Sequence, residues 1–300
     1  QPLWIDSVDK VSEVDRTETA VLSDLKNRIA EAGWGRAFLK RQQPDGHWGR
    51  AFYQPKWTSS HYTLVDLRNL CIPATPEIKK ALALILATSI GPDGGINPSK
   101  DIEQSDVCIN GMFLNYGCYF GTDEEKLRSV VDFIVSQQLA DGGFNCRLNR
   151  SGARHSSMHS TISVLEGIRE YIAAGYAFRA EELKRIEGEA QEFLLRHRLF
   201  KSDHTGAVIH PSFLKLVYPP RWRYDILRAL DYFQSVGYPY DERLQDALDI
   251  LKEKRLSDGR WKTQAHHPGE VHFQMEQAGK PSRWNTLRCL RVLEYYDRDA

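Results

Sequence analysis

The sequence predicts an all-α protein, an (α/α) toroid built from about five helical hairpins. An Asp-Gly pair recurs about every 50 residues, at Asp45, Asp93, Asp141 and Asp258, and residues 203–206 (Asp-His-Thr-Gly) form a looser copy. Before each turn lies a stretch whose apolar residues have the 3.6-residue spacing of an amphipathic helix. No stretch has the alternation of apolar and polar residues that predicts a β-strand.

Each repeat is expected to contain two helices. The first helices are predicted at residues 29–43, 78–88, 127–138, 186–198 and 244–254, and the second helices begin near residues 59, 105, 156, 223 and 282. Ser and Asp near these second starts suit the N-cap, where their oxygens accept hydrogen bonds from free amides. Because one hairpin cannot bury both of its faces, five in tandem are expected to stack into a ring with the more apolar helices inside. Residues 1–20 are predicted to be an N-terminal extension, and residues 21–300 a single toroid domain.

The charge balance and the cysteines indicate which binding partners and which cellular compartment are favoured. Forty Lys and Arg balance forty Asp and Glu, so no global field favours nucleic acid or an anionic membrane surface. No apolar run approaches the roughly 20 residues of a membrane-spanning helix. The five cysteines include no Cys-x-x-Cys motif, which argues against a disulfide scaffold and favours the cytoplasm. The sequence allows a partner subunit without indicating one.

Candidate substrate-binding residues gather at the starts of the second helices. In a ring of hairpins these helices run parallel, so their N-termini converge on one end of the central cavity. The residues concerned are Trp57, His61, Tyr62, Arg221, Trp222, Arg223, Arg283 and Trp284. Guanidinium groups there would bind an anionic group, and the aromatic rings would contact an apolar or sugar ring. In the alternative interpretation, the Trp residues pack between hairpins and the Arg residues bond helix-end carbonyls.

The turns carry a more specific pattern. Residues 38–48 (FLKRQQPDGHW) and 133–144 (FIVSQQLADGGF) share a Gln pair followed by Asp-Gly and an aromatic residue, and residues 250–261 hold a third copy with Arg in place of Gln. This pattern resembles the glutamine-tryptophan repeat of the terpenoid cyclases and the protein prenyltransferase β-subunits. The Gln would bond the turn backbone, and the aromatic residue would cover the helix end.

The resemblance implies a zinc site in the prenyltransferase branch. Those enzymes hold zinc with an Asp-x-Cys at the start of one inner helix and a His at the start of the next, and Asp106-Val107-Cys108 and His159 match these positions. Carboxylate, thiolate and imidazole are ligands that zinc accepts, and three of them leave one coordination position open for catalysis. His155 is an alternative ligand or a partner that orients His159. In the alternative interpretation, Asp106 caps its helix, Cys108 is a small buried apolar residue and His159 bonds a neighbouring group.

The chain also departs from this family. It lacks the Asp-x-Asp-Asp run of the squalene-type cyclases, which disfavours cyclisation by alkene protonation. Lys100 is the sole cation just before the Asp-x-Cys segment, where Asp101 and Glu103 add negative charge, whereas the prenyltransferases bind a diphosphate with cations there. The sequence therefore gives only weak support for protein prenylation as the activity of this chain.

Three functional classes follow. The first is a zinc enzyme that acts on an isoprenoid or another apolar substrate with an anionic head group. The second is a metal-free carbohydrate enzyme of the polysaccharide lyase or glycosidase type, since toroids of five or six hairpins also resemble those enzymes. The third is a non-catalytic ligand-binding toroid. Asp106, His159 and Tyr224 are the candidate catalytic residues. In the carbohydrate class, the groups needed could come from Asp106, His61, Tyr62, Tyr224 and Arg283.

A His-rich stretch and a lone glutamate complete the features that the sequence predicts. The stretch 259–280 holds His266, His267, Glu270 and His272 and is too long for a simple turn, so it is predicted to cover the mouth of the cavity as a solvated lid. Glu166, on an otherwise apolar helix, is predicted to bond the next inner helix rather than to act in catalysis.

Overall fold

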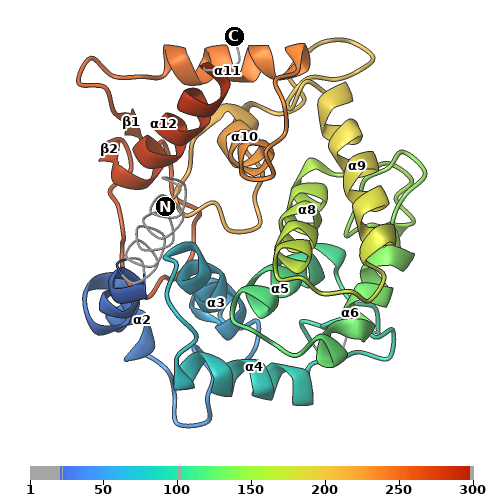
Figure 1. The fold of residues 1–300 in the computed structure, drawn as a ribbon, viewed down its shortest axis with the longest axis vertical. Coiled ribbons are helices and arrows are strands. Elements are labelled where there is room, and N and C mark those ends of the chain that lie inside the picture. The colour runs from blue at the N-terminus through green and yellow to red at the C-terminus, as the bar shows by residue number, and fades with distance from the viewer. Residues whose placement is uncertain (1–20, 22, 100–102, 298–300) are drawn as a thin grey trace, which may run out of the picture.

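The helices come in pairs, one pair for each predicted repeat (Figure 1). The computed structural model describes residues 21, 23–99 and 103–297. The first helices are α2 (Gly33–Leu39), α4 (Pro76–Thr88), α6 (Glu124–Ser136), α9 (Ala180–Arg196) and α11 (Gln245–Glu253). The second helices are α3 (Ser60–Asn69), α5 (Val107–Tyr119), α8 (Met158–Ala173), α10 (Ile226–Ser235) and α12 (Arg283–Asp297). The chain is mostly helical, and each predicted helix has a counterpart.

Shorter helical segments lie between these pairs. They are η1 (Lys56–Thr58), α7 (Leu148–Ser151), η2 (Pro211–Leu214) and η3 (Glu242–Leu244). Residues 23–31 are helical as well. The predicted extension at residues 1–20, together with Lys100 and Asp101, lies outside the described residues.

The second helices are the more deeply buried members of the pairs in the middle of the chain. Figure 1 shows α4, α6, α9 and α11 around the outside of the view, with α3, α5, α8 and α10 nearer its middle. Helix α3 contacts α5, α5 contacts α8, α8 contacts α10, and α10 contacts α12. Buried residues cover most of the surface of α5 and α8, whereas α6 buries one face, as expected for an amphipathic helix on the outside.

The last hairpin packs against the first. The Trp34 ring stacks on Trp284 with ring centroids 6.3 Å apart, and the Phe38 ring lies 4.6 Å from that of Phe273. These contacts join α2 to α12 and to the loop that precedes α12. One apolar core cluster extends from Phe38 in the first hairpin to Tyr296 in the last.

The turn pattern has the structural role that the sequence predicts. The indole N–H of Trp48 donates to the Phe38 carbonyl at 2.8 Å, and that of Trp261 donates to the Leu251 carbonyl at 2.7 Å. Each tryptophan thus satisfies a carbonyl at the end of the helix that precedes it. The Gln42 side chain donates to the Gly46 carbonyl in the same turn. Gly46 has φ 101°, which favours glycine in this turn.

One short sheet departs from the expectation that the chain has no strands. Strand β1 (Trp261–Lys262) pairs antiparallel with β2 (Pro281–Ser282). Two residues are too few to produce a pattern of alternation, so the sequence gives no sign of them. Their pairing closes the base of the His-rich loop between them. None of the described helices has the length and apolar character needed to cross a bilayer.

Candidate ligand-binding site

Four of the predicted substrate-binding residues meet near the start of α3. The Trp57 ring lies 4.8 Å from that of Tyr62, and the Arg221 guanidinium lies 4.5 Å above the Trp57 ring. Lys56 Nζ lies between two indoles, 4.9 Å from the Trp57 centroid and 5.1 Å from that of Trp222. Segments about 160 residues apart in sequence therefore form one aromatic and cationic wall.

Arg221 is the most unusual member of this wall. Its φ is 56°, a left-handed conformation that residues other than glycine seldom adopt. Its side chain is 6% exposed, and its Nη2 lies 3.9 Å from Asp66 Oδ2, beyond hydrogen-bond distance. Its Nη1 has no hydrogen-bond partner among the described residues. A buried guanidinium that lacks a full set of partners is costly, so the site is suited to an anionic ligand that completes them.

Asp66 neutralises Arg221 only in part near pH 6. The carboxyl group is 2% exposed, and its Oδ1 lacks a hydrogen-bond partner among the described residues. Burial raises the pKa of Asp66 to about 6, although Arg221 opposes that shift. Since part of the Asp66 population is protonated near this pH, Asp66 only partly neutralises Arg221.

A central cavity of about 200 Å³ lies next to Arg221, between α3, α5, α8, α10 and α12. Six arginines line it: Arg68, Arg169, Arg221, Arg228, Arg288 and Arg291. The carboxylates in the lining are Glu166 and Asp231. Met112, Tyr218, Trp284 and Leu287 add apolar surface. An apolar wall with a few converging charged groups is typical of a small-molecule site.

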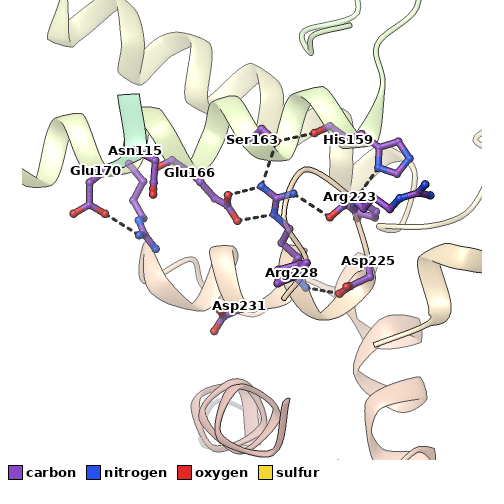
Figure 2. A network of polar contacts seen from close by, with 12 residues as sticks. Asn115, His159, Ser163, Glu166, Glu170, Arg223, Asp225, Arg228 and Asp231 are labelled. Carbon is purple, nitrogen blue, oxygen red and sulfur yellow. Dashed lines mark hydrogen bonds and ion pairs between the residues drawn. The ribbon is translucent and has the colours of Figure 1, made fainter. Parts of the chain in front are cut away.

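Most of these arginines belong to ion pairs between helices (Figure 2). Arg228 of α10 is 3% exposed and binds Glu166 of α8 through two hydrogen bonds, of 2.8 and 2.6 Å. It also donates to Ser163 Oγ at 3.2 Å and to the Arg223 carbonyl at 3.0 Å. The prediction that Glu166 bonds the next inner helix is therefore confirmed.

Two more carboxylates hold the remaining pairs. Glu170 binds Arg68 at 2.5 Å and Arg169 at 3.0 Å, and Asp231 binds Arg288 at 3.1 Å and also Arg291. Six arginines thus face four carboxylates, when Asp66 is included with Glu166, Glu170 and Asp231. Arg68 Nε and Arg288 Nη1 are buried without a hydrogen-bond partner among the described residues. The cavity therefore carries an excess of cations together with free donor groups.

The His-rich loop packs against Trp57 and Thr63, close to Arg221. The Trp57 indole N–H donates to the Pro268 carbonyl at 2.7 Å, and Thr63 Oγ1 bonds His272 Nε2 at 2.9 Å. Beneath the loop lies a second cavity of about 210 Å³, which shares Tyr218 and Arg221 with the central cavity. Burial lowers the pKa of His267 and of His272 to about 4, so both rings are neutral at pH 7. The loop is therefore held by Trp57 and Thr63, and its role as a solvated lid stays a prediction.

Of the other predicted substrate-binding residues, His61 and Arg223 contact the wall through Tyr62 and Trp222, whereas Arg283 and Trp284 lie apart from it. His61 is fully buried, and its Nδ1 bonds the Tyr116 hydroxyl at 3.2 Å. Arg283 is exposed and lies above the Trp34 ring. Trp284 stacks on Tyr218 and lines the central cavity. Arg223 packs over the Trp222 ring.

The three predicted zinc ligands do not meet. His159 Nδ1 accepts the Tyr224 amide at 2.7 Å, and its ring packs against Phe213 and Trp222. Burial, reinforced by Arg228 and Arg223, lowers the pKa of His159 to about 4. Figure 2 shows the imidazole beside Arg223. Among the described residues, no three His, Cys, Asp or Glu side chains are grouped so that they could hold a metal ion.

The Asp-x-Cys segment instead approaches another cysteine. Asp106 is the N-cap of α5, and Cys108 lies in the first turn of that helix. The Cys108 amide N–H donates to Cys146 Sγ at 3.2 Å. Cys108 is therefore partnered with Cys146, rather than with His159 as a zinc site of this type would require.

The remaining candidates have structural contacts of their own. The Tyr224 hydroxyl is buried and donates to the Leu199 carbonyl at 2.5 Å, and burial raises the pKa of Tyr224. His155 is exposed, and its carbonyl accepts the Asn145 side chain. Neither residue lines the central cavity.

Sequence reasoning missed Asp66 and five of the cavity arginines. Arg288 and Arg291 are three residues apart on α12, which places them on one helix face. That spacing could have indicated a shared site for the two arginines. Arg68, Arg169 and Arg228 are each the single arginine of their helix, so no spacing pointed to them. Neither the protein-family models nor the curated proteins contain a match to this chain.

Proposed function

We propose that the chain is an (α/α) toroid of the terpenoid cyclase and prenyltransferase type, whose central cavity binds an isoprenoid or another apolar molecule with an anionic head group. The observation that carries the proposal is Arg221. Its buried guanidinium lies at the edge of an arginine-lined cavity, and its Nη1 lacks a hydrogen-bond partner among the described residues. A phosphate or carboxylate would supply the missing acceptor and offset the excess of arginines.

The apolar part of the ligand would lie against Met112, Tyr218, Trp284 and Leu287. These side chains come from α5, α12 and the loop before α10, so they surround the cavity from several directions. A ligand with a charged head and a hydrocarbon tail matches this division of the lining better than a sugar, whose hydroxyl groups need many hydrogen-bond partners.

Two observations support the ring arrangement in this proposal. Neighbouring second helices are in contact in chain order from α3 to α12, and the stacked rings of Trp34 and Trp284 join the first hairpin to the last. The turns of the glutamine-tryptophan type add support, because their side chains make the bonds expected of such a repeat.

Zinc at Asp106, Cys108 and His159 stays a prediction, and no step of the proposed function depends on it. The described side chains do not fit this ligand set, because His159 accepts a backbone amide in a cationic environment. The carbohydrate-enzyme alternative has less support, because the Tyr224 hydroxyl donates to the Leu199 carbonyl within the core and the His61 ring is fully buried. Elemental analysis of the purified chain measures bound zinc directly.

Calorimetric titration with farnesyl diphosphate, farnesol and inorganic diphosphate tests the proposal. Farnesyl diphosphate should bind more tightly than either of its two parts, since it alone has both the charge and the tail. Arg221→Gln should weaken its binding about tenfold or more, because one charge-assisted hydrogen bond contributes about 1.5–3 kcal/mol.

Arg283→Gln is the matched control. Arg283 is an exposed arginine at the start of α12 that does not line the central cavity, so its replacement should leave the affinity unchanged. Equal binding of farnesol and farnesyl diphosphate, or equal losses in the two variants, would contradict the proposal. Release of inorganic diphosphate in the same samples separates an enzyme from a non-catalytic binding toroid.

A further inference from the structure

Two cysteines from different repeats lie against one another at the start of α5. Cys146 Sγ lies 3.2 Å from the Cys108 amide nitrogen and 3.2 Å from Ser160 Oγ. The two thiols are close enough that each shifts the pKa of the other: Cys146 raises the pKa of Cys108, and Cys108 lowers that of Cys146. Both cysteines are free, and both residues are intermediate in exposure. The structure therefore holds a pair of adjacent free thiols.

The surroundings hold Cys146 in this position. Its own backbone N–H donates to Ser160 Oγ at 3.1 Å, while the Ser160 hydroxyl donates to its sulfur. Ser160 lies in the first turn of α8, and Cys108 lies in the first turn of α5. Two helices thus contribute one donor each to the same sulfur atom. This arrangement differs from the zinc set implied by the resemblance, in which the partner of Cys108 would be His159.

We propose that Cys108 and Cys146 form a redox-active dithiol, which closes to a disulfide by exchange with a small disulfide such as glutathione disulfide. Cys146 is the attacking residue, because the Cys108 amide and the Ser160 hydroxyl donate to its sulfur and stabilise negative charge there. Cys108 is the resolving residue, because its thiol lies next to the sulfur that becomes part of the mixed disulfide.

The exchange balances in two steps. In the first, the Cys146 sulfur bonds to one sulfur of glutathione disulfide, the S–S bond of that molecule breaks, and one glutathione leaves with the proton from Cys146. In the second, the Cys108 sulfur attacks the Cys146 sulfur, the mixed disulfide breaks, and the second glutathione leaves with the proton from Cys108. The protein loses two electrons and two protons, and one glutathione disulfide becomes two thiols.

The disulfide would tie two segments at the edge of the candidate site. Cys146 precedes α7 in the loop between α6 and α8, while Cys108 begins the helix whose residue Met112 lines the central cavity. Formation of the bond would replace the contacts of Cys146 with Ser160 and with the Cys108 amide. The oxidation state would thereby change how this loop is held against α5.

Disulfide mapping of the full chain tests the proposal. The protein is incubated with glutathione disulfide, free thiols are blocked with iodoacetamide, and the peptides are analysed by mass spectrometry without reduction. A linked peptide pair that contains Cys108 and Cys146 is expected, with loss of both alkylated forms. Exposed Cys71 serves as an internal control and should carry only a glutathione adduct. Alkylation of both Cys108 and Cys146 while Cys71 reacts would overturn the proposal.

Two variants assign the roles within the pair. Cys108→Ser should trap the glutathione adduct on Cys146, because the resolving thiol is gone, whereas Cys146→Ser should leave Cys108 largely unmodified. The reverse pattern would overturn the order of attack. The result with the unaltered chain requires no variant to fold, so the existence of the dithiol is tested independently of these substitutions.

Discussion

Helices α5 and α8 pack backbone against backbone, whereas α8, α10 and α12 are linked by charged side chains around a cavity. Gly111 and Gly167 face one another in the first contact, and a Cβ on Gly111 would lie 2.5 Å from the Ser163 carbonyl oxygen. In the second region, Arg228 joins α10 to Glu166 of α8, and Asp231 joins α10 to Arg288 of α12. Small residues let the first two helices meet closely, while long side chains keep the others apart and leave room for a ligand.

The α5–α8 contact and the arginine region between α8, α10 and α12 should therefore respond differently to substitution. Close packing resists changes of even one methyl group, so the α5–α8 contact is expected to be rigid and intolerant of substitution. Ion pairs across a cavity depend on charge balance, so the arginine region is expected to respond to the loss of one partner, to pH and to anions.

The largest effect is expected at the glycine contact. Gly167→Ala places a methyl group against the Gly111 carbonyl oxygen, so the two helices must separate. We expect a loss of about 3 kcal/mol in the free energy of unfolding, measured by urea denaturation.

Gly188→Ala in α9 is the matched control for this substitution. A Cβ on Gly188 meets no atom within 4 Å, so the change should stabilise the protein by about 0.5–1 kcal/mol through its helix propensity. Losses of similar size in both variants would show that the α5–α8 contact is not specially tight.

A somewhat smaller effect is expected from the central ion pair. Glu166→Ala leaves the Arg228 guanidinium, which is 3% exposed, without its carboxylate partner. The unfolding free energy should fall by about 2.5 kcal/mol, less than for a fully buried pair because Glu166 is 25% exposed.

An ion pair on the surface provides the control for Glu166→Ala. Glu189 pairs with Arg185 on α9, and both side chains are about half exposed. Glu189→Ala should change the unfolding free energy by less than about 0.5 kcal/mol. If Glu166→Ala were equally harmless, the arginine network would not hold α8 and α10 together.

The smallest of these effects is the loss of unfolding free energy as the pH falls. Burial lowers the pKa of His61 to about 3 from its ordinary value near 6.5, so the folded state disfavours the protonated ring. The resulting stability is present above pH 6.5 and is lost as the pH falls toward 3. We expect a decrease of about 2 kcal/mol between pH 7 and pH 5, measured by urea denaturation at each pH.

His61→Asn separates this residue from other acid-sensitive groups. The variant should have a shallower dependence on pH than the unaltered chain, because Asn does not titrate. A slope should remain, since burial also lowers the pKa of His159, His267 and His272 to about 4. An unchanged slope would mean that His61 does not control the acid sensitivity.

The sequence predicted the helices more completely than the site. Apolar spacing and Asp-Gly turns are local signals, and they located both helices of every repeat within a few residues. The bonds of Trp48 and Gln42 could likewise be predicted, because each lies within one turn. The pairing of β1 with β2 could not, since two residues carry no periodic signal.

The cavity depends on how separate helices are rotated, which local patterns do not specify. Arg228 stands in the same repeat as Arg221, yet the structure directs Arg228 to Glu166 and leaves Arg221 beside Trp57. Similarly, His159 had the position expected of a ligand, but its ring accepts the Tyr224 amide. Residue type and spacing gave candidates, and the tertiary contacts selected among them.

The indole bonds of Trp48 and Trp261 have a consequence for the evolution of such chains. Each indole satisfies a carbonyl of the helix that precedes it in the same repeat. Because the tryptophan and the helix whose carbonyl it bonds belong to the same repeat, a tandem duplication of that repeat would copy both. The carbonyl that the indole bonds would then need no partner from the neighbouring copy. The loops between the copies could diverge in sequence afterwards.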